Sequence, residues 1–252
     1  MKMTDRLPGP ALPPQPQRRI TGLLYHRSAL WPVPRRPVRA THRICGFIFV
    51  LCLSAGIGLA ESKNYQTVIT KASRDIAEGK LEDAVAQAAL AQKLDPNNPE
   101  TANLLGVIAL QKKDYSEAVT QLNRAIARDP KFYAAKFNLA DVLMIQGNYD
   151  QARAVLEELR QFDPNSEVVQ FKVALTYILA NQPEKASALI DEMQFPGKTP
   201  AYYYARAAFW LKRGLEKDAK QYSINAHKYY TNDECRYFVR VLQEMGFDVS
   251  SF

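Results

Sequence analysis

Residues 146–164 read QGNYDQARAVLEELRQFDP, and two earlier stretches repeat this pattern at intervals of 34 residues. They are KKDYSEAVTQLNRAIARDP at 112–130 and EGKLEDAVAQAALAQKLDP at 78–96, and all three align without a gap. The recurring positions are Gly79, Lys113 and Gly147, then Ala84, Ala118 and Ala152, and finally Pro96, Pro130 and Pro164. Self-similarity at a fixed period of this length is typical of a protein built from stacked repeats.

Each repeat predicts two helices. In residues 99–132, apolar or small residues recur at the i, i+3, i+4 spacing of one helical face in two separate stripes. The first stripe is Ala102, Leu105, Gly106, Ala109 and Leu110, and the second is Tyr115, Ala118, Leu122, Ala125 and Ile126. Lys113-Asp114 separates the stripes, and Pro130 ends the second because proline disfavours a helical residue before it. The small residues Gly106 and Ala118 would allow the two helices to approach closely.

This pattern resembles the tetratricopeptide repeat family, whose signature runs Trp, Leu-Gly, Tyr, Ala, Phe, Ala, Pro. The matching positions are Ala102, Leu105-Gly106, Ala109, Ala118, Leu122, Ala125 and Pro130, then Lys136, Leu139-Ala140, Leu143, Ala152, Leu156, Leu159 and Pro164. Smaller residues replace the aromatic ones of the family. The resemblance implies an all-α fold, a right-handed α-solenoid of about five helical hairpins with a C-terminal capping helix.

The repeat boundaries follow from the period. We expect repeats at about 65–98, 99–132, 133–166, 167–200 and 200–231, and a final helix at 233–245. The fourth repeat ends in MQFPGKTP instead of Asp-Pro, and the fifth keeps only part of the pattern. Asn232 is the predicted N-cap of the final helix and Gly246 its stop. A solenoid needs such an end helix because its last repeat otherwise exposes an apolar face.

The first sixty residues differ from the rest. Residues 1–43 are rich in Pro and Arg, show no period and are predicted to be disordered, whereas residues 44–60 (ICGFIFVLCLSAGIGLA) carry no charge. We interpret residues 44–60 as a signal-peptide core with cleavage before Glu61 or, alternatively, as an uncleaved membrane anchor. The long leader suggests a further hypothesis, that translation starts at Val38 and residues 1–37 are a gene-model extension. Either interpretation places residues 61–252 outside the cytoplasm.

The net charge of +7 is concentrated at the N-terminus. Residues 1–60 hold nine of the 33 basic side chains and one of the 26 acidic ones, so the repeat region is nearly neutral. Binding to a nucleic-acid backbone needs clustered Lys and Arg on the binding domain. We therefore expect no nucleic-acid partner.

The inventory of reactive residues argues against an enzyme. Past residue 60 the chain has one cysteine, Cys235, and one histidine, His227. A Cys/His metal set or a disulfide framework cannot be assembled from these two residues. No glycine-rich phosphate loop and no convergent pair of acids is present. We expect no catalytic residue, no cofactor and no metal.

The resemblance implies a protein or peptide partner, bound on a concave surface lined by the first helix of each hairpin. The predicted partner-binding residues are Asn103, Val107, Leu110, Phe137, Asp141, Met144, Phe171, Leu175 and Tyr204. The apolar members suggest a groove for an apolar or amphipathic segment. The alternative is that these residues pack between hairpins, or that the superhelix closes on its own tail. The many aromatic residues of the last third fit either a core or an interface.

The leading functional hypothesis is a protein-interaction scaffold or adaptor of the bacterial cell envelope, exported or anchored through residues 44–60. One alternative is a cytosolic adaptor that resembles a co-chaperone. The Lys, Asn and Arg positions of the family's carboxylate clamp are not matched, so no chaperone C-terminus is expected to bind in that way. A second alternative is an enzyme accessory subunit.

Overall fold

Eleven α-helices make up most of the chain that the computed structural model describes, residues 52–249 and 252. No strand occurs in these residues, and side chains are described from residue 64 onward. The helices are α1 (Cys52–Ala77), α2 (Leu81–Leu94), α3 (Pro99–Gln111), α4 (Tyr115–Arg128), α5 (Tyr133–Ile145), α6 (Tyr149–Phe162), α7 (Glu167–Leu179), α8 (Pro183–Glu192), α9 (Ala201–Lys212), α10 (Glu216–Ala226) and α11 (Asn232–Glu244).

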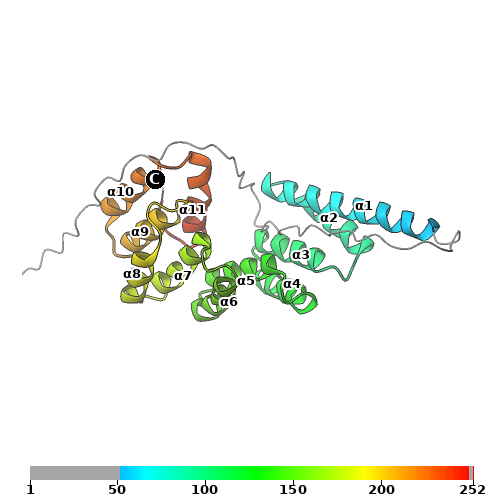
Figure 1. Ribbon diagram of the computed structural model, residues 1–252, viewed down its shortest axis with the longest axis horizontal. Helices are drawn as coiled ribbons and strands as arrows, with labels where there is room; N and C mark the ends of the chain where they lie inside the picture. Colours follow the sequence, from blue (N-terminus) through cyan, green and yellow to red (C-terminus); the bar gives the residue numbers. More distant parts are fainter. Residues whose placement is uncertain (1–51, 250–251) are drawn as a thin grey trace, which may run out of the picture.

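The first ten helices form five consecutive hairpins, from α1–α2 to α9–α10, arranged side by side as a curved array (Figure 1). The predicted all-α solenoid of about five hairpins and an end helix is therefore confirmed. We call the surface formed by α3, α5, α7 and α9, the first helices of their hairpins, the inner face.

The turns inside the hairpins share one backbone conformation. Gly79, Gly147 and Gly214 have φ of +75°, +81° and +73°, and the equivalent residues Lys113 and Asn181 have φ of +62° and +57°. This left-handed region suits glycine because it has no Cβ. It lets the chain reverse within a few residues, and the recurrence of Gly79, Lys113 and Gly147 in the sequence follows from it.

The connections between the first hairpins also repeat. The carboxylates of Asp95, Asp129 and Asp163 each accept a hydrogen bond from the backbone N–H two residues ahead, at 3.2, 2.9 and 3.3 Å. Aspartate commonly forms this turn because its short side chain reaches its own backbone. The Asp-Pro pairs of the sequence therefore end one hairpin and orient the next.

Close helix packing depends on the small residues of the repeats. A Cβ placed on Gly106 of α3 would lie 2.7 Å from Cγ of Leu122 on α4, well inside a normal contact. Ala118 and Leu122 are fully buried at this crossing. The predicted role of Gly106 and Ala118 in close approach is confirmed.

The predictions for the N-terminal leader lie outside the described residues, since residues 1–51 are not described. Helix α1 continues without interruption through Ala60 and Glu61, the position of the predicted cleavage site. Among the described helices, none combines the length and the apolar composition needed to cross a membrane.

The end helix α11 is present, but its N-cap differs from the one predicted. Thr231, not Asn232, caps the helix: its hydroxyl accepts a hydrogen bond from the Glu234 N–H, and the Glu234 carboxylate accepts one from the Thr231 N–H. This reciprocal capping box satisfies two backbone donors, whereas an asparagine cap would satisfy one. Gly246, at φ +83°, follows the end of the helix as expected.

Candidate partner-binding groove

The nine predicted partner-binding residues do not line an open groove. Phe171, Leu175 and Tyr204 are fully buried, and Asn103, Val107, Phe137 and Met144 are at most 7% exposed. Only Leu110 and Asp141 are half-buried. The expectation of an open apolar surface around Phe137 and Phe171 is therefore corrected: in this conformation these side chains contact other parts of the chain.

Helix α11 covers the part of this surface that α7 and α9 form. It turns back from α10 and lies against α7 and α9 (Figure 1). The ring of Phe238 meets the edge of the Phe171 ring at 5.1 Å between centroids and stacks on the Tyr204 ring at 5.6 Å. Both alternatives to an open groove therefore occur: the chain's own tail covers Phe171 and Tyr204, whereas Asn103 and Phe137 contact the next hairpin.

The buried face of α11 has the spacing of a helix bound in a groove. Cys235, Phe238, Val241 and Leu242 are at most 4% exposed. On the opposite face the side chains of Asp233 and Arg236 are 82% and 61% exposed. A hydrophobic groove binds an amphipathic helix through anchor residues at these intervals on one face of the helix.

The chain continues past α11 along the same surface. The ring of Phe252 lies 6.3 Å from that of Tyr204, and Val249 is 4% exposed.

Burial raises the pKa of the Cys235 thiol, which faces Tyr204. This thiol is therefore held in its neutral form and acts as a small apolar group, since the thiolate is the reactive species.

Charged side chains lie at one end of the surface that α11 covers. Lys172 of α7 is completely buried, forms an ion pair with Asp141 of α5, and places its ammonium 3.9 Å from the centre of the Phe137 ring. A buried cation needs such partners because losing its hydration is costly. The equivalent cation one repeat later, Arg206, pairs with Asp191 of α8.

Glu244, near the end of α11, lies at the edge of this charged cluster, and its side chain is 44% exposed. Partial burial and the negative charge of Asp141 raise its pKa, while Arg240 and Lys172 oppose the shift. Its ionised carboxylate is therefore less well accommodated than its neutral form.

The inner face is also polar nearer the N-terminus. Asn138 of α5 donates a hydrogen bond from Nδ2 to Oδ1 of Asn103 on α3 at 2.9 Å, and both residues are buried. Tyr65 of α1 shares a hydrogen bond of 2.9 Å with Thr101 of α3, and burial raises the pKa of Tyr65 to about 12. These contacts join neighbouring hairpins, so Asn103 is explained by packing within the array.

The aromatic residues of the last third mostly form core. Tyr203 and Phe209 are at most 5% exposed, and the Tyr203 ring packs against Phe195, Tyr202, Tyr229 and Tyr230. Tyr230 donates a hydrogen bond to the carbonyl of Gly197 at 2.8 Å. This cluster fixes the α8–α9 loop and the segment that leads into α11.

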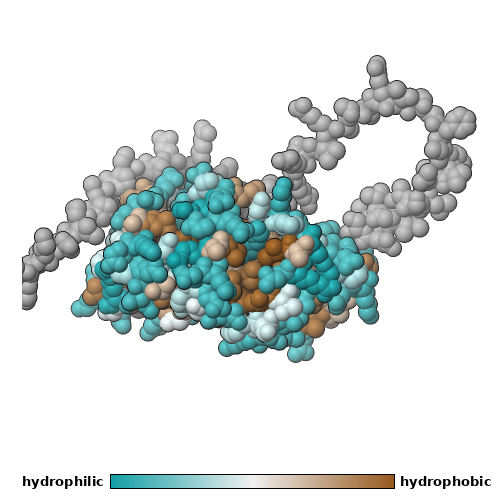
Figure 2. All heavy atoms as spheres, turned by 90° about the horizontal axis from the view of Figure 1, so that it is seen from below, coloured by the Kyte–Doolittle hydropathy of each residue, from teal (hydrophilic) through white to brown (hydrophobic). Residues whose placement is uncertain are grey.

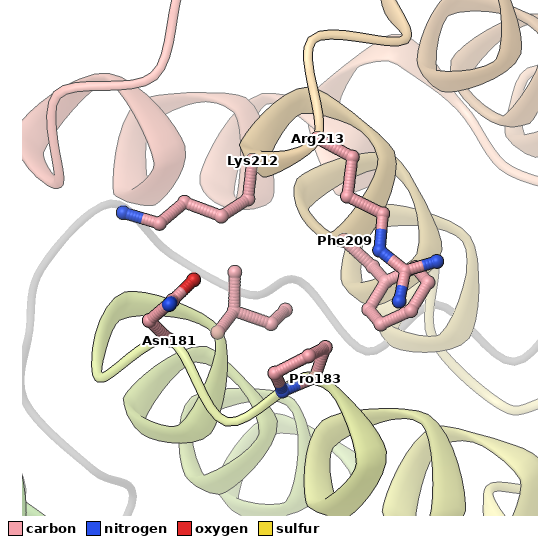
Figure 3. Close-up of a pocket in the computed structure, with 6 residues that line it drawn as sticks. Asn181, Pro183, Phe209, Lys212 and Arg213 are labelled. Atoms are coloured by element: carbon pink, nitrogen blue, oxygen red, sulfur yellow. The ribbon is translucent and has the colours of Figure 1, made fainter.

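A small hollow lies beside the turn between α7 and α8 (Figure 3). It is lined by Ile178, Asn181, Pro183, Phe209, Lys212 and Arg213 and has a volume of about 60 Å³. Arg213 lies over the Phe209 ring at 4.1 Å, and Lys212 extends along the rim. Sites for drug-sized ligands usually enclose about 300–1,000 Å³. The hollow is far too small for such a ligand.

On the face seen in Figure 2, apolar residues gather near the middle of the array and are surrounded by hydrophilic ones. The exposed large apolar side chains of the described residues include Leu90 at 40% and Phe162 at 52%. Within the described residues, no group of three or more His, Cys, Asp or Glu side chains is arranged to hold a metal ion.

Comparison with known proteins identifies the family. Tetratricopeptide repeat profiles match residues 69–131, 109–175 and 143–209, which together cover more than half of the chain. This chain belongs to the tetratricopeptide repeat family.

The individual relatives share limited sequence identity with this chain. TPR repeat-containing protein YpiA of Bacillus subtilis is 27% identical over 144 residues, which cover 57% of this chain and 34% of that protein. The chain thus spans about a third of that relative. A thermophilic repeat protein of Thermus thermophilus superposes with a TM-score of 0.58 at 21% identity, over 71% of this chain and 99% of that one. A repeat protein of Parabacteroides merdae gives 0.57 at 18%, over 77% and 75%. These two likenesses concern the fold alone.

No role at the partner-binding surface is expected for Lys172 from the sequence, although the structure buries this cation beside Asp141. The docking of α11 corresponds only to the alternative in which the array closes on its own tail, although the spacing of Phe238, Val241 and Leu242 was an available signal. Periodicity shows that a helix has an apolar face, but not which surface that face covers.

Proposed function

We propose that this protein is a scaffold or adaptor that binds a helix or peptide of a partner protein on the inner face of its repeat array. Tetratricopeptide repeats generally mediate protein–protein interactions. The observation that carries the proposal is the seat of α11: the inner face already binds one amphipathic helix, that of its own chain.

The chemistry of the groove supports binding better than catalysis. Its core is apolar and aromatic, and its buried cation Lys172 is neutralised by the carboxylate of Asp141. Such a surface recognises the shape and apolar pattern of a ligand. The mostly apolar contact with a few fixed polar groups is the usual composition of a helix-binding groove.

Photo-crosslinking in cells tests this function. A photoreactive amino acid at Leu110, half-buried on the inner face, should crosslink to a specific partner, whereas the same group at Gln151, exposed on α6, should not. Equal crosslinking from both positions would contradict binding on the inner face. Mass spectrometry of the crosslinked product would identify the partner segment.

We also propose that the repeat array acts in the bacterial cell envelope, outside the cytoplasm. The uncharged run at residues 44–60 and the basic leader before it support this location. Cell fractionation with N-terminal sequencing tests it. A mature chain that starts at Glu61 would show export and cleavage, while a full-length chain in the cytosolic fraction would contradict the proposal and favour the cytosolic adaptor.

A further inference from the structure

Helix α11 and the groove between α7 and α9 form a recognition unit of defined chemistry. The helix contributes one apolar face, and the groove contributes two aromatic walls, Phe171 and Tyr204, between which Phe238 is held. Aromatic side chains in fully desolvated pockets commonly dominate the binding energy of an interface. Phe238 is thus the anchor of this interaction.

We propose that α11 is a displaceable self-ligand: the groove that it fills is the binding site for an amphipathic helix of a partner protein with an aromatic anchor equivalent to Phe238. This inference rests on the proposed scaffold function and specifies its ligand.

The tether of α11 permits exchange. The five residues 227–231 separate α10 from α11, and Tyr230 is fixed through its hydrogen bond to the Gly197 carbonyl. The capping box of Thr231 and Glu234 lies within the segment that would move and involves no other helix. Helix α11 can therefore leave the groove as an intact helix, together with Val249 and Phe252 that follow it, without disturbing the five hairpins.

The tether protects the site from weak ligands. A segment linked by a few residues has an effective concentration on the order of millimolar at its binding site. A free partner present at a lower concentration can displace α11 only if its dissociation constant for the groove is correspondingly lower than that of α11. The same occupancy keeps Phe171 and Tyr204 out of water when no partner is present, which prevents unspecific association.

A peptide competition experiment tests the proposal on the full chain. The probe is a fluorescent peptide of residues 231–247, and its binding is measured by anisotropy at pH 7.5 with wild-type protein and with Phe238→Asp. This substitution places a charge in the apolar groove and should release α11. The matched control, Gln243→Asp, puts the same charge on the exposed side of α11.

We expect the peptide to bind the Phe238→Asp protein at least tenfold more tightly than the wild-type or Gln243→Asp protein. A peptide with Phe238→Ala should bind at least tenfold more weakly than the unchanged peptide. Absence of binding, or equal binding of the unchanged and Phe238→Ala peptides, would overturn the inference. A released protein that dimerises in light scattering by exchanging α11 would also overturn it, in favour of a second copy as the occupant.

Hydrogen exchange on the wild-type protein provides an independent measurement in case Phe238→Asp does not fold. Amides of α11 should exchange at least tenfold faster than those of α7 and α9, because α11 opens on its own. Exchange of all three helices at one rate would show that α11 is a fixed part of the array. If the peptide fails while crosslinking from Leu110 still identifies a partner, the scaffold function stands and this groove is not its site.

Discussion

The ring of Phe238 stacks on the ring of Tyr204 with 5.6 Å between centroids and 14° between planes, although the two residues lie 34 positions apart. Phe238 belongs to the end helix and Tyr204 to the first helix of the last hairpin. This single contact determines which surface is available to a partner, because it places α11 on the inner face.

Replacing Phe238 with alanine should release α11 without unfolding the hairpins. Loss of a buried phenylalanine ring typically lowers stability by about 3–5 kcal/mol. Here the loss should mainly weaken the docking of α11. Limited trypsin digestion detects the release of α11, because Arg236 and Arg240 lie within this helix. We expect rapid cleavage at these sites while residues 64–226 remain intact. Cleavage throughout the chain at one rate would show instead that α11 and the hairpins unfold together.

Gly106→Ala should lower the free energy of unfolding by about 1–2 kcal/mol. Alanine is favoured over glycine in a helix by about 1 kcal/mol, but its Cβ would lie 2.7 Å from Cγ of the fully buried Leu122. Urea denaturation measures the change. In a Leu122→Ala background the overlap is removed, so the same substitution should become stabilising. Destabilisation in both backgrounds would contradict this explanation.

Lys113→Gly should stabilise the protein by about 0.5–1 kcal/mol. Lys113 has φ +62°, a conformation that costs a residue with a Cβ roughly 1–2 kcal/mol, and glycine gives back part of this gain through greater freedom in the unfolded chain. The neighbour Lys112 has φ −77° and provides the control. Thermal unfolding should show a higher midpoint for Lys113→Gly and a lower one for Lys112→Gly.

The sequence predicts the hairpins well because their determinants are local. Gly106 and Ala118 mark a close helix crossing, and the turn position at Gly79 and Gly147 marks a left-handed residue; each needs only its neighbours within one repeat. The 34-residue period then places every hairpin relative to the next.

The groove could not be predicted in the same way because its state depends on a distant segment. The spacing of Phe137 and Phe171 correctly places them on the first helices of their hairpins. Whether they are open to solvent depends on the position of α11, and on the ion pair between Lys172 and Asp141. The first is a contact with the end helix and the second a contact between neighbouring hairpins, and no pattern within one repeat specifies them.

Thr231→Ala should weaken α11 by about 1 kcal/mol, since the hydroxyl accepts the first backbone hydrogen bond of the helix and the capping box is lost with it. Asn232→Ala should have a much smaller effect, because Asn232 lies inside the helix. Hydrogen exchange of the first turn of α11 distinguishes the two. Equal effects would restore Asn232 as the cap.

Docking of α11 should weaken as the pH rises. The groups that face Glu244 are Asp141 on α5, Lys172 on α7 and Arg240 on α11, and their combined effect with partial burial is a raised pKa. The docked state therefore binds the Glu244 proton more tightly than the undocked state, whose pKa lies near the ordinary value of about 4.3. The stabilisation is complete below that value and is lost as the pH rises through the raised pKa.

Trypsin cleavage cannot be compared across such a range, so hydrogen exchange of α11, corrected for the intrinsic pH dependence, is the measurement. Glu244→Gln should hold α11 more firmly at pH 7.5 and reduce the change in protection between pH 4 and pH 7.5. A variant with the same pH profile as the wild type would assign the effect to other groups.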